Sequence, residues 1–401
     1  MAVVPYHSMV YRKKPRRRLN FAFWVLLLLH LSFLLTTLWL VYRLLISDFN
    51  PKPVRLAEPP LLEGGLQENR WLQNASLIAK SQVLGPESLY VEENTIYTGT
   101  WDGKIVKIVN ATISKVLRLV ECDLKCGTYE DEPICGRPMG IRRLNSREFV
   151  VADAYLGIFV VNFEDESIRR IFTSNQTIDE VEPRFLNDLD VLNEHTIIVS
   201  HSTAKYDRRR YLLVFMEQNP NGRLLKVNVN TGEAEILASR LRFPNGVQIH
   251  SDRESVLVAE TSMAQIRRIF ISGERKGQSE IFAQNLPGYP DNIRLSTNKT
   301  LLIGLQNPRL PFETQIIDAT GPRPWMRKFL AALVPERFLR FAINLISPSY
   351  GLAIELDLNG TIVRSYHDPD GRINDISQIS DHNGFLYLGS FHGDYIAKVP
   401  K

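Results

Sequence analysis

Residues 243–246 read Phe-Pro-Asn-Gly and residues 290–293 read Pro-Asp-Asn-Ile, and the two stretches lie about one repeat apart. Each stands just ahead of a β-rich apolar run. Proline fixes φ, and Asn and Asp carry side-chain oxygens that bind hard cations. Either stretch alone is an ordinary turn sequence. Their recurrence at matched places in a repeated unit predicts that both serve one site.

The chain after its N-terminal region repeats one pattern: an apolar strand, a small or polar residue at its end, a turn, and a second apolar strand. In the third copy we expect this second strand over residues 211–215. The starts lie roughly 45 to 60 residues apart, except before the last copy, which is the period of a four-stranded propeller blade. A β-sandwich would show strands without this period. The sequence therefore predicts an all-β fold, a six-bladed β-propeller. The first strands of the six copies are expected at residues 96–100, 149–153, 197–200, 256–260, 301–304 and 385–389.

The long last interval indicates a helical insertion around residues 308–348. Residues 324–333 have helical spacing, and residues 337–346 predict a second short helix. One interpretation is a lid packed on the propeller face. The other is an amphipathic segment that touches the membrane, with its basic side chains at the lipid headgroups. These side chains are Arg327, Lys328, Arg337 and Arg340.

The N-terminus predicts a membrane anchor. Residues 19–42 contain no Asp, Glu, Lys or Arg, and at ~1.5 Å per residue they reach ~36 Å, enough for a ~30 Å hydrocarbon core. The run is too long for a cleaved signal peptide. Six basic residues lie within residues 12–18, so this flank is expected in the cytosol. The sequence thus predicts a single-pass type II membrane protein. Its parts are a cytosolic tail (1–18), a transmembrane signal-anchor helix (19–42), a Pro-rich stalk (43–70) and a propeller (71–401).

The composition after the anchor fits a lumenal or extracellular domain of the plasma membrane or endoplasmic reticulum. Removing the six tail cations from 48 leaves 42 against 44 anions, about −2, so no nucleic-acid surface is indicated. Nothing in the sequence indicates an oligomeric state. Five N-x-[ST] sequons follow the anchor and predict glycosylation. They are Asn74, Asn110, Asn175, Asn298 and Asn359.

Three cysteines, Cys122, Cys126 and Cys135, lie close together. In an oxidising compartment they predict one disulfide and one remaining thiol. A Cys126–Cys135 pair would close a loop. A zinc half-site is the alternative, but no His or Cys partner pair is nearby.

The loops that feed the innermost strands of a propeller converge on its central channel. Candidates there are rich in carboxylate and amide oxygens and contain no thiol, which suits calcium before magnesium or manganese. If Glu87 and Asp291 come within ~5 Å, their repulsion at an effective dielectric of 20 is about 3 kcal/mol, which a divalent ion removes. A shared proton, or pairing with Arg137 or Arg184, are the alternatives. The candidates are Glu87, Arg137, Asn187, Asp188, Asn245, Asp291 and Asn292.

The sequence resembles strictosidine synthase-like proteins from its basic tail to its C-terminus. The stretches that carry the resemblance are residues 126–140, 185–189, 242–248, 287–294, 367–371 and 386–390. The resemblance implies a six-bladed propeller, a membrane anchor and arylesterase-like activity. The related paraoxonases and regucalcin-type lactonases hold calcium in the central tunnel.

Carried onto this chain, the resemblance implies that Glu87, Asn245 and Asp291 are metal ligands and that Asn292 is a further ligand or near neighbour. It implies that Asn187 binds the ion or the substrate, and it makes Cys126–Cys135 the disulfide. We add Arg137 as a candidate substrate contact.

Three departures bear on the activity. His201 stands where relatives often place Asp or Asn, and imidazole is a poor calcium ligand. Ser377 stands ahead of the turn at residues 381–384, where the alkaloid-forming synthases carry a catalytic Glu, so strictosidine synthesis is not expected. The His pair of the paraoxonases has no counterpart, and His201 is the one candidate.

Two hypotheses follow. The first is a calcium-dependent hydrolase of small esters or lactones, with Asp291 or His201 as the base that activates water. The second is a propeller that binds a partner without catalysis and holds a structural calcium.

Overall fold

The first of two units contains one long apolar helix. The structure, a computed structural model, describes residues 21–121, 126–313, 316–347 and 349–401, and the chain divides between Asp48 and Phe49. In the first unit α1 (Phe21–Ile46) has 26 residues, and at ~1.5 Å per residue its ~39 Å could span a membrane. The helix continues past the predicted end at residue 42. The predicted cytosolic tail lies outside the described residues.

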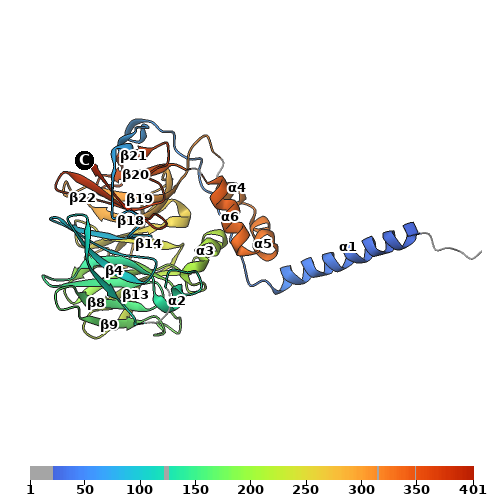
Figure 1. The fold of residues 1–401 in the computed structure, drawn as a ribbon, viewed down its shortest axis with the longest axis horizontal. Helices are drawn as coiled ribbons and strands as arrows, with labels where there is room; N and C mark the ends of the chain where they lie inside the picture. Colours follow the sequence, from blue (N-terminus) through green and yellow to red (C-terminus); the bar gives the residue numbers. More distant parts are fainter. Residues whose placement is uncertain (1–20, 122–125, 314–315, 348) are drawn as a thin grey trace, which may run out of the picture. The chain divides into compact units, whose positions relative to one another are not determined.

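The second unit, residues 49–401, is a six-bladed β-propeller, which confirms the predicted fold (Figure 1). Each blade is a four-stranded antiparallel sheet. The strands of blades 1 to 3, from the innermost outward, are β2 (Leu89–Glu92), β3 (Thr95–Gly99), β4 (Lys104–Val109), β5 (Thr112–Arg118); β6 (Pro138–Arg143), β7 (Glu148–Asp153), β8 (Gly157–Asn162), β9 (Ile168–Thr173); and β10 (Leu186–Asn193), β11 (Thr196–His201), β12 (Gly222–Asn228), β13 (Ala234–Leu241).

Blades 4 to 6 complete the ring, and the sixth blade joins both ends of the propeller sequence. Its outermost strand, β1, comes from the N-terminal side and pairs with β24, with Ser76 opposite Lys398. This pairing closes the circle of blades. The strands are β14 (Pro244–Ile249), β15 (Ser255–Glu260), β16 (Gln265–Phe270), β17 (Ser279–Ala283); β18 (Gly288–Leu295), β19 (Leu301–Pro308), β20 (Gly351–Leu356), β21 (Ile362–Asp368); and β22 (Ile376–His382), β23 (Phe385–Ser390), β24 (Ile396–Pro400), β1 (Ser76–Ile78).

Burial along the strands follows from this stacking. The middle strands β8 and β15 are buried at every residue because each sheet packs on a neighbouring blade through both faces. The outermost strand β5 instead alternates between exposed and more buried residues. A separate apolar cluster lies between each pair of neighbouring blades. The continuous apolar runs of the sequence are therefore blade interiors.

The innermost strands β2, β6, β10, β14, β18 and β22 contact one another in a closed ring. Five of them carry a shift of register against the second strand of their blade, close to their N-terminal ends. In β10, β14 and β18 the irregular segments are residues 187–188, 245–246 and 291–292. A β-bulge breaks the strict alternation of side chains and can re-aim them. Four predicted ligand residues, Asn187, Asn245, Asp291 and Asn292, lie on these irregular segments, whereas Glu87 lies just ahead of the regular strand β2.

Gly246 allows two innermost strands to approach closely. A Cβ at this position would lie 2.3 Å from the Asp291 carbonyl oxygen and 2.7 Å from the Asn292 Cα. We expect Gly246→Ala to push β14 away from β18 and to cost about 1–3 kcal/mol, or a fall of about 2–6 °C in Tm. Gly277→Ala is the control, because a Cβ there would meet no atom within 4 Å. The only strain in this variant comes from the positive φ of residue 277. Equal losses of Tm in the two variants would contradict this explanation.

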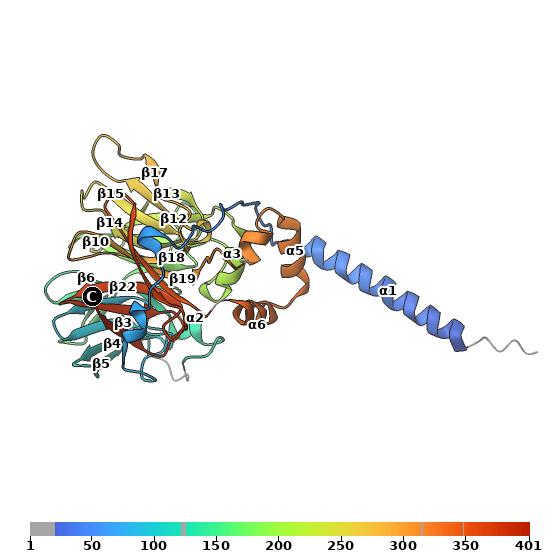
Figure 2. The same cartoon turned by 90° about the horizontal axis from the view of Figure 1, so that it is seen from above.

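Helices cover one end of the ring, where α3 (Tyr211–Glu217), α5 (Pro324–Leu333) and α6 (Glu336–Ile346) gather on the same side of the propeller (Figure 2). The predicted insertion is confirmed as α5 and α6, preceded by the short α4 (Ile316–Thr320). The remaining short helices are α2 (Glu132–Cys135), η1 (Gly64–Leu66), η2 (Trp71–Asn74), η3 (Arg208–Arg210) and η4 (Thr261–Met263).

Two predictions about this region are wrong. Residues 211–215 form helix α3 and not a strand, because a short apolar run fits a buried helix as well as a strand. The segment 43–70 is not a free stalk. Its first residues belong to α1, and Phe49 and Val54 are buried in the second unit. Backbone hydrogen bonds from Lys52 to Glu217 and from Val54 to Gly321 hold this segment on the helices.

Candidate metal site in the central channel

The predicted ligands lie at the start of the innermost strands and are buried. Asn187 belongs to β10, Asn245 to β14, and Asp291 and Asn292 to β18, whereas Glu87 just precedes β2. All five side chains are at most 3 % exposed. The structure thus places the five residues at the same end of the central ring.

Contacts between the strands bring most of these side chains together. Asn187 donates through Nδ2 to the Ser202 hydroxyl (3.2 Å), which donates to the carbonyl of Pro244 (2.7 Å). The charge of Glu87 acts on Asp291, and Asp291 accepts a hydrogen bond from the Asn245 side chain. The ligand set, defined as Glu87, Asn187, Asn245, Asp291 and Asn292, therefore draws on blades 1, 3, 4 and 5.

Three oxygens of the ligand set are buried and lack a hydrogen-bond partner: Asn245 Oδ1, Asp291 Oδ1 and Asn292 Oδ1. An unsatisfied buried polar atom costs about 1–3 kcal/mol, so three at adjacent positions call for a compensating group. Oxygen atoms from carboxylates and amides are the ligands that calcium prefers. The residues present fit a hard cation. In the described residues no cluster of three or more His, Cys, Asp or Glu could hold a metal, and the oxygens here are mostly amides.

The charge on Asp291 is poorly compensated by the protein. Burial, followed by the charges of Glu87 and Asp188, raises the pKa of Asp291 well above its ordinary value. The hydrogen bond from Asn245 and the charge of Arg294 oppose that increase. A cation between Asp291 and Glu87 would favour the ionised form of both carboxylates.

Arg137 is paired with the ligand set and does not face a described pocket. It is fully buried, and its guanidinium donates to Glu87 Oε2 (3.1 Å) and to the carbonyl of Phe391 (3.2 Å). Its Nε and one terminal nitrogen lack a hydrogen-bond partner. Burial and the charge of Arg208 lower the pKa of Arg137, while Glu87 opposes the decrease. Its predicted role as a substrate contact stays a prediction, and the structure shows it orienting Glu87.

His201 lies on the other face of its strand. Its neighbours Ser200 and Ser202 contact Asp188 and Asn187, and alternation along β11 turns the imidazole to the opposite side. There His201 Nδ1 accepts a hydrogen bond from Arg223 Nε (3.0 Å). Burial, followed by the charge of Arg223, lowers the pKa of His201 to about 3. This geometry does not support His201 as the base, and that role stays a prediction.

A second polar layer adjoins the ligand set, and of its residues only Asp188 is a predicted channel residue. Arg294 donates through both terminal nitrogens to the two carboxylate oxygens of Asp188, at 2.8 and 3.1 Å. Arg142 lies 3.6 Å from Asp188 and 3.7 Å from Asp190. These two arginines and two aspartates, all on innermost strands, balance one another in charge. The backbone N–H of Val247 also donates to Asp188.

Aligning the six inner strands reveals a five-residue pattern that recurs in the sequence. This pattern marks the residues of both layers. Its second position supplies Glu87, Asn187, Asn245 and Asp291, and its fifth position supplies Arg142, Asp190 and Arg294. Blades 2 and 6 have Met139 and Ser377 at the second position. The six copies are Pro-Glu-Ser-Leu-Tyr (86–90), Pro-Met-Gly-Ile-Arg (138–142), Leu-Asn-Asp-Leu-Asp (186–190), Pro-Asn-Gly-Val-Gln (244–248), Pro-Asp-Asn-Ile-Arg (290–294) and Ile-Ser-Gln-Ile-Ser (376–380).

A histidine that sequence analysis missed lies beside the Glu87–Arg137 pair. His392 follows Phe391, whose carbonyl accepts a hydrogen bond from Arg137, and its Nδ1 is 3.9 Å from Asp375 Oδ2. Partial burial and the charges of Arg208, Arg137 and Arg340 lower the pKa of His392, although its side chain is still 38 % exposed. Burial raises the pKa of Asp375 to about 6. No sequence motif marks His392.

The Cys126–Cys135 disulfide is confirmed, with an S–S distance of 2.00 Å. The loop that it closes is held to the propeller through Glu132. This carboxylate accepts hydrogen bonds from the Tyr155 hydroxyl (2.7 Å) and from Arg208 (3.3 Å). Cys122, predicted to be the remaining thiol, lies outside the described residues.

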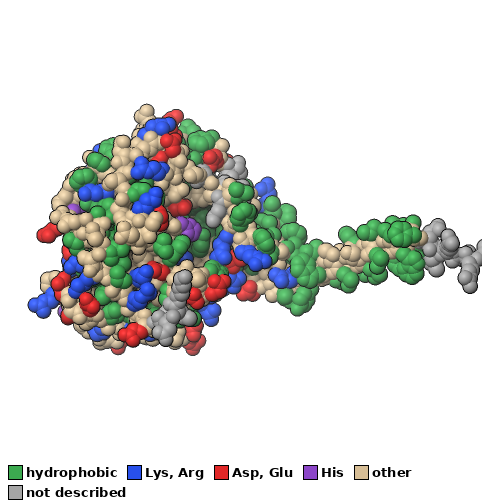
Figure 3. All heavy atoms as spheres, in the orientation of Figure 1, with side chains coloured by type: hydrophobic (Ala, Val, Ile, Leu, Met, Phe, Trp, Pro, Cys, Tyr) green, Lys and Arg blue, Asp and Glu red, His purple; other side chains and the backbone are tan. Residues whose placement is uncertain are grey.

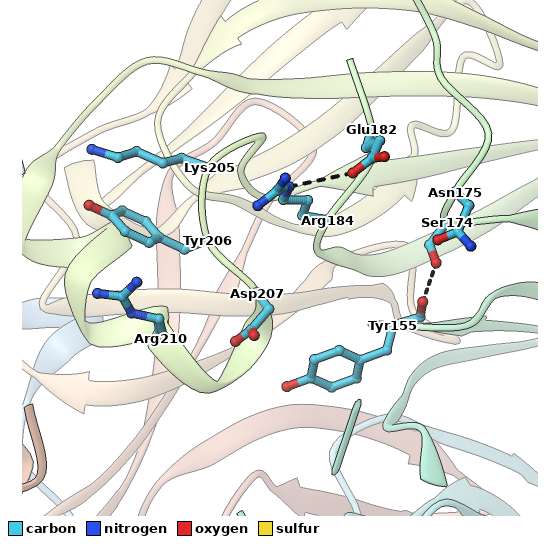
Figure 4. A pocket seen from close by; sticks show the side chains of 9 residues that line it. All are labelled: Tyr155, Ser174, Asn175, Glu182, Arg184, Lys205, Tyr206, Asp207 and Arg210. Carbon is cyan, nitrogen blue, oxygen red and sulfur yellow. Dashed lines mark hydrogen bonds and ion pairs between the residues drawn. The ribbon is translucent and has the colours of Figure 1, made fainter. Parts of the chain in front are cut away.

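A polar pocket of about 280 Å³ lies apart from the ligand set, and Figure 4 shows its lining. Glu182 and Arg184 form an ion pair in it (3.6 Å), and Ser174 donates to the carbonyl of Tyr155. No member of the ligand set lines this pocket. Its residues are Tyr155, Ser174, Asn175, Glu182, Arg184, Lys205, Tyr206, Asp207 and Arg210.

The five asparagines of the sequons are all exposed, as glycosylation requires, and Asn175 stands at this pocket. Their modification stays a prediction. The exposed residues are Asn74, Asn110, Asn175, Asn298 and Asn359.

Known structures share this architecture at low sequence identity. A luciferin-regenerating enzyme has a TM-score of 0.53 and 11% identity, covering 82% of this chain and 95% of its own. A gluconolactonase from Xanthomonas campestris has a TM-score of 0.53 and 12% identity, covering 88% and 98%. The calcium-binding protein regucalcin from Agrobacterium tumefaciens has a TM-score of 0.52 and 9% identity, covering 81% and 93%. These likenesses show the fold alone.

Sequence comparisons identify the family. The family model for strictosidine synthase matches residues 187–274, and the model for the strictosidine synthase-like N-terminal region matches residues 64–108. The human adipocyte plasma membrane-associated protein is 39% identical over 89% of this chain and 85% of its own length. The protein of that name from Salmo salar is 39% identical over 91% and 87%. The chain, itself a six-bladed propeller with strictosidine synthase-like regions, therefore belongs to the adipocyte plasma membrane-associated protein family.

Proposed function

We propose that this protein is a membrane-anchored, calcium-dependent hydrolase of small esters or lactones. The observation that carries the proposal is the group of three buried oxygens without partners, on Asn245, Asp291 and Asn292. Together with Glu87 and Asn187 they would hold calcium. When bound, calcium would polarise the substrate carbonyl and stabilise the charge that develops on its oxygen. The neighbouring lactonase and regucalcin folds agree with such an activity.

The chain's own residues supply the remaining steps. Hydrolysis requires a base that takes a proton from water while the water oxygen attacks the carbonyl carbon, and that returns a proton to the leaving oxygen as the ester C–O bond breaks. His392 is partly exposed, follows the residue whose carbonyl binds Arg137, and lies 3.9 Å from Asp375, so we assign this role to His392, with Asp291 as the second candidate. Arg137 holds Glu87 in place.

The alternative is a non-catalytic binding protein with a structural calcium. Two observations favour it: every member of the ligand set is at most 3 % exposed, and the polar pocket in Figure 4 does not reach them. In either case we propose a type II orientation at the plasma membrane or endoplasmic reticulum. The relatives are named as plasma membrane-associated.

The full chain, purified in detergent, tests the two functions with phenyl acetate as the substrate. We expect chelation to lower the hydrolysis rate at least tenfold and added calcium to restore it. We expect His392→Ala to lower kcat by about 10²–10⁴-fold, the usual contribution of a general base, while leaving the calcium-dependent rise in Tm unchanged. His195→Ala is the control, because His195 is an exposed turn residue. A calcium-dependent Tm without any calcium-dependent turnover would support the binding protein instead.

A further inference from the structure

Helices α5 and α6 expose large apolar side chains. Trp325 is 68 % exposed and Phe329, one turn later on α5, is 46 % exposed. On α6, Phe338, Phe341 and Leu345 follow an i, i+3, i+7 spacing, which places them on one face. Phe341 is 67 % exposed and Leu345 is 73 % exposed. We call these five residues the aromatic face.

The aromatic face is not the side by which the helices pack on the propeller. Leu339 of α6 is buried and Leu330 of α5 packs against the same cluster, which also contains Phe49 and residues of α3. The two helices therefore have one apolar side in the core and a second apolar side in solvent. Exposed apolar surface of this extent marks a contact with another apolar body.

The chain itself limits how far this face can be from the membrane. Only Ser47 and Asp48 separate the last residue of α1 from Phe49, and three residue steps span at most about 11 Å. Phe49 is buried in the cluster that α5 and α6 share. Arg327 of α5 donates to the carbonyl of Lys52 (2.7 Å), which fixes the following residues as well. If α1 spans a bilayer, the base of α5 and α6 is held near its surface.

Basic side chains next to the aromatic face suit lipid headgroups. Arg323, Lys328 and Arg337 form no ion pair with any carboxylate in the described part of the chain, whereas Glu336 is paired with Arg210 (3.3 Å) and Asp318 with Arg309 (2.8 Å). Figure 3 shows hydrophobic and basic side chains side by side over these helices. Trp at the interface and Lys or Arg reaching the phosphates are typical of helices that lie in a membrane surface.

We propose that the aromatic face of α5 and α6 rests in the leaflet on the propeller's side of the membrane that α1 spans. The occupant of this face is phospholipid, with the aromatic side chains at the level of the acyl-chain boundary and, at the phosphates, the three basic side chains that form no ion pair among the described residues. The short connection favours lipid over a second copy of the chain, because it brings the bilayer to this face before any partner binds. The propeller then has two points of attachment to one membrane.

Site-specific photocrosslinking of the full chain in phosphatidylcholine liposomes tests this proposal. The photoreactive residue benzoylphenylalanine replaces Phe341 in one protein and Trp325 in another. It replaces Ile281 in the control, an exposed residue of β17 away from these helices in Figure 2. We expect at least ten times more lipid adduct at positions 341 and 325 than at position 281.

Each other outcome overturns the proposal. Crosslinking of position 341 to a second copy of the chain would assign the face to a dimer. Equal lipid adduct at positions 341 and 281 would mean that the face meets lipid only by chance. The enzymatic proposal does not enter this experiment, because the adducts are measured without substrate.

Discussion

Replacing Asp291 by Asn is expected to raise the Tm of the calcium-free protein and to remove its stabilisation by calcium. The Asp291 carboxyl group is buried close to the charges of Glu87 and Asp188, so ionising it without calcium sets up a repulsion. Asn keeps the shape of the side chain and removes this repulsion, and each 1 kcal/mol recovered raises Tm by about 2–4 °C. The wild-type protein should gain about 2.7 kcal/mol from calcium at a hundred times its Kd, whereas the variant should gain little. The rate at which the variant hydrolyses phenyl acetate should be at least 10²-fold lower than that of the wild-type protein.

The pH dependence follows from the same carboxyl group. Its folded-state pKa is raised, so between the unfolded and folded pKa values the native state binds more protons, and stability without calcium falls as pH rises. Calcium displaces this proton, so its affinity should rise with pH over that range. Melting curves at pH 5 and pH 8, with calcium and with chelator, measure both effects. A lower Tm for Asp291→Asn in chelator would contradict the proposed repulsion.

Replacing Arg294 by Met should destabilise the protein by about 3–5 kcal/mol, because it leaves the buried Asp188 without its bidentate partner. Most of the loss should be present both with calcium and with chelator, because Arg294 pairs with Asp188 and acts on Asp291 only through its charge. Urea unfolding of the two proteins measures the difference in free energy.

The matched control also removes the charge of Asp188, which the single variant leaves unpaired. The double variant Arg294→Met/Asp188→Asn should recover part of the stability, which shows that the cost comes from the unpaired carboxylate. If the single variant loses less than about 1 kcal/mol, Arg142 alone is enough to balance Asp188 and the second layer is not a coupled unit.

The fold could be predicted from the sequence because each blade carries the same local pattern. Apolar runs such as residues 149–153 and 256–260 are blade interiors, buried on both faces. The period of the runs then fixes the number of blades. Helix α3 could not be separated from a strand, since its seven residues are too short for a helical period to show. The prolines after α1 predict a stalk, whereas Phe49 and Val54 are buried in the second unit, because burial of two apolar residues leaves no periodic signal in the sequence.

Four members of the ligand set could be predicted because Glu87, Asn187, Asn245 and Asp291 recur at one position of the repeat, at or just before the start of an inner strand, and Asn292 follows Asp291. The direction of a side chain is harder to predict, because it depends on strand alternation and on bulges. His201 faces away for the first reason, and Asp291 and Asn292 lie in a bulge. His392 and Asp375 come together through the fold alone, since no motif joins them.

We propose that oxygens from four blades surround one calcium ion in the channel. A crystal structure of the protein grown in calcium tests it most directly. We expect one strong density peak about 2.3–2.6 Å from Asn245 Oδ1 and Asp291 Oδ1, with calcium-like anomalous signal. Only water-like density at hydrogen-bond distance from these atoms, unchanged by calcium, would contradict it.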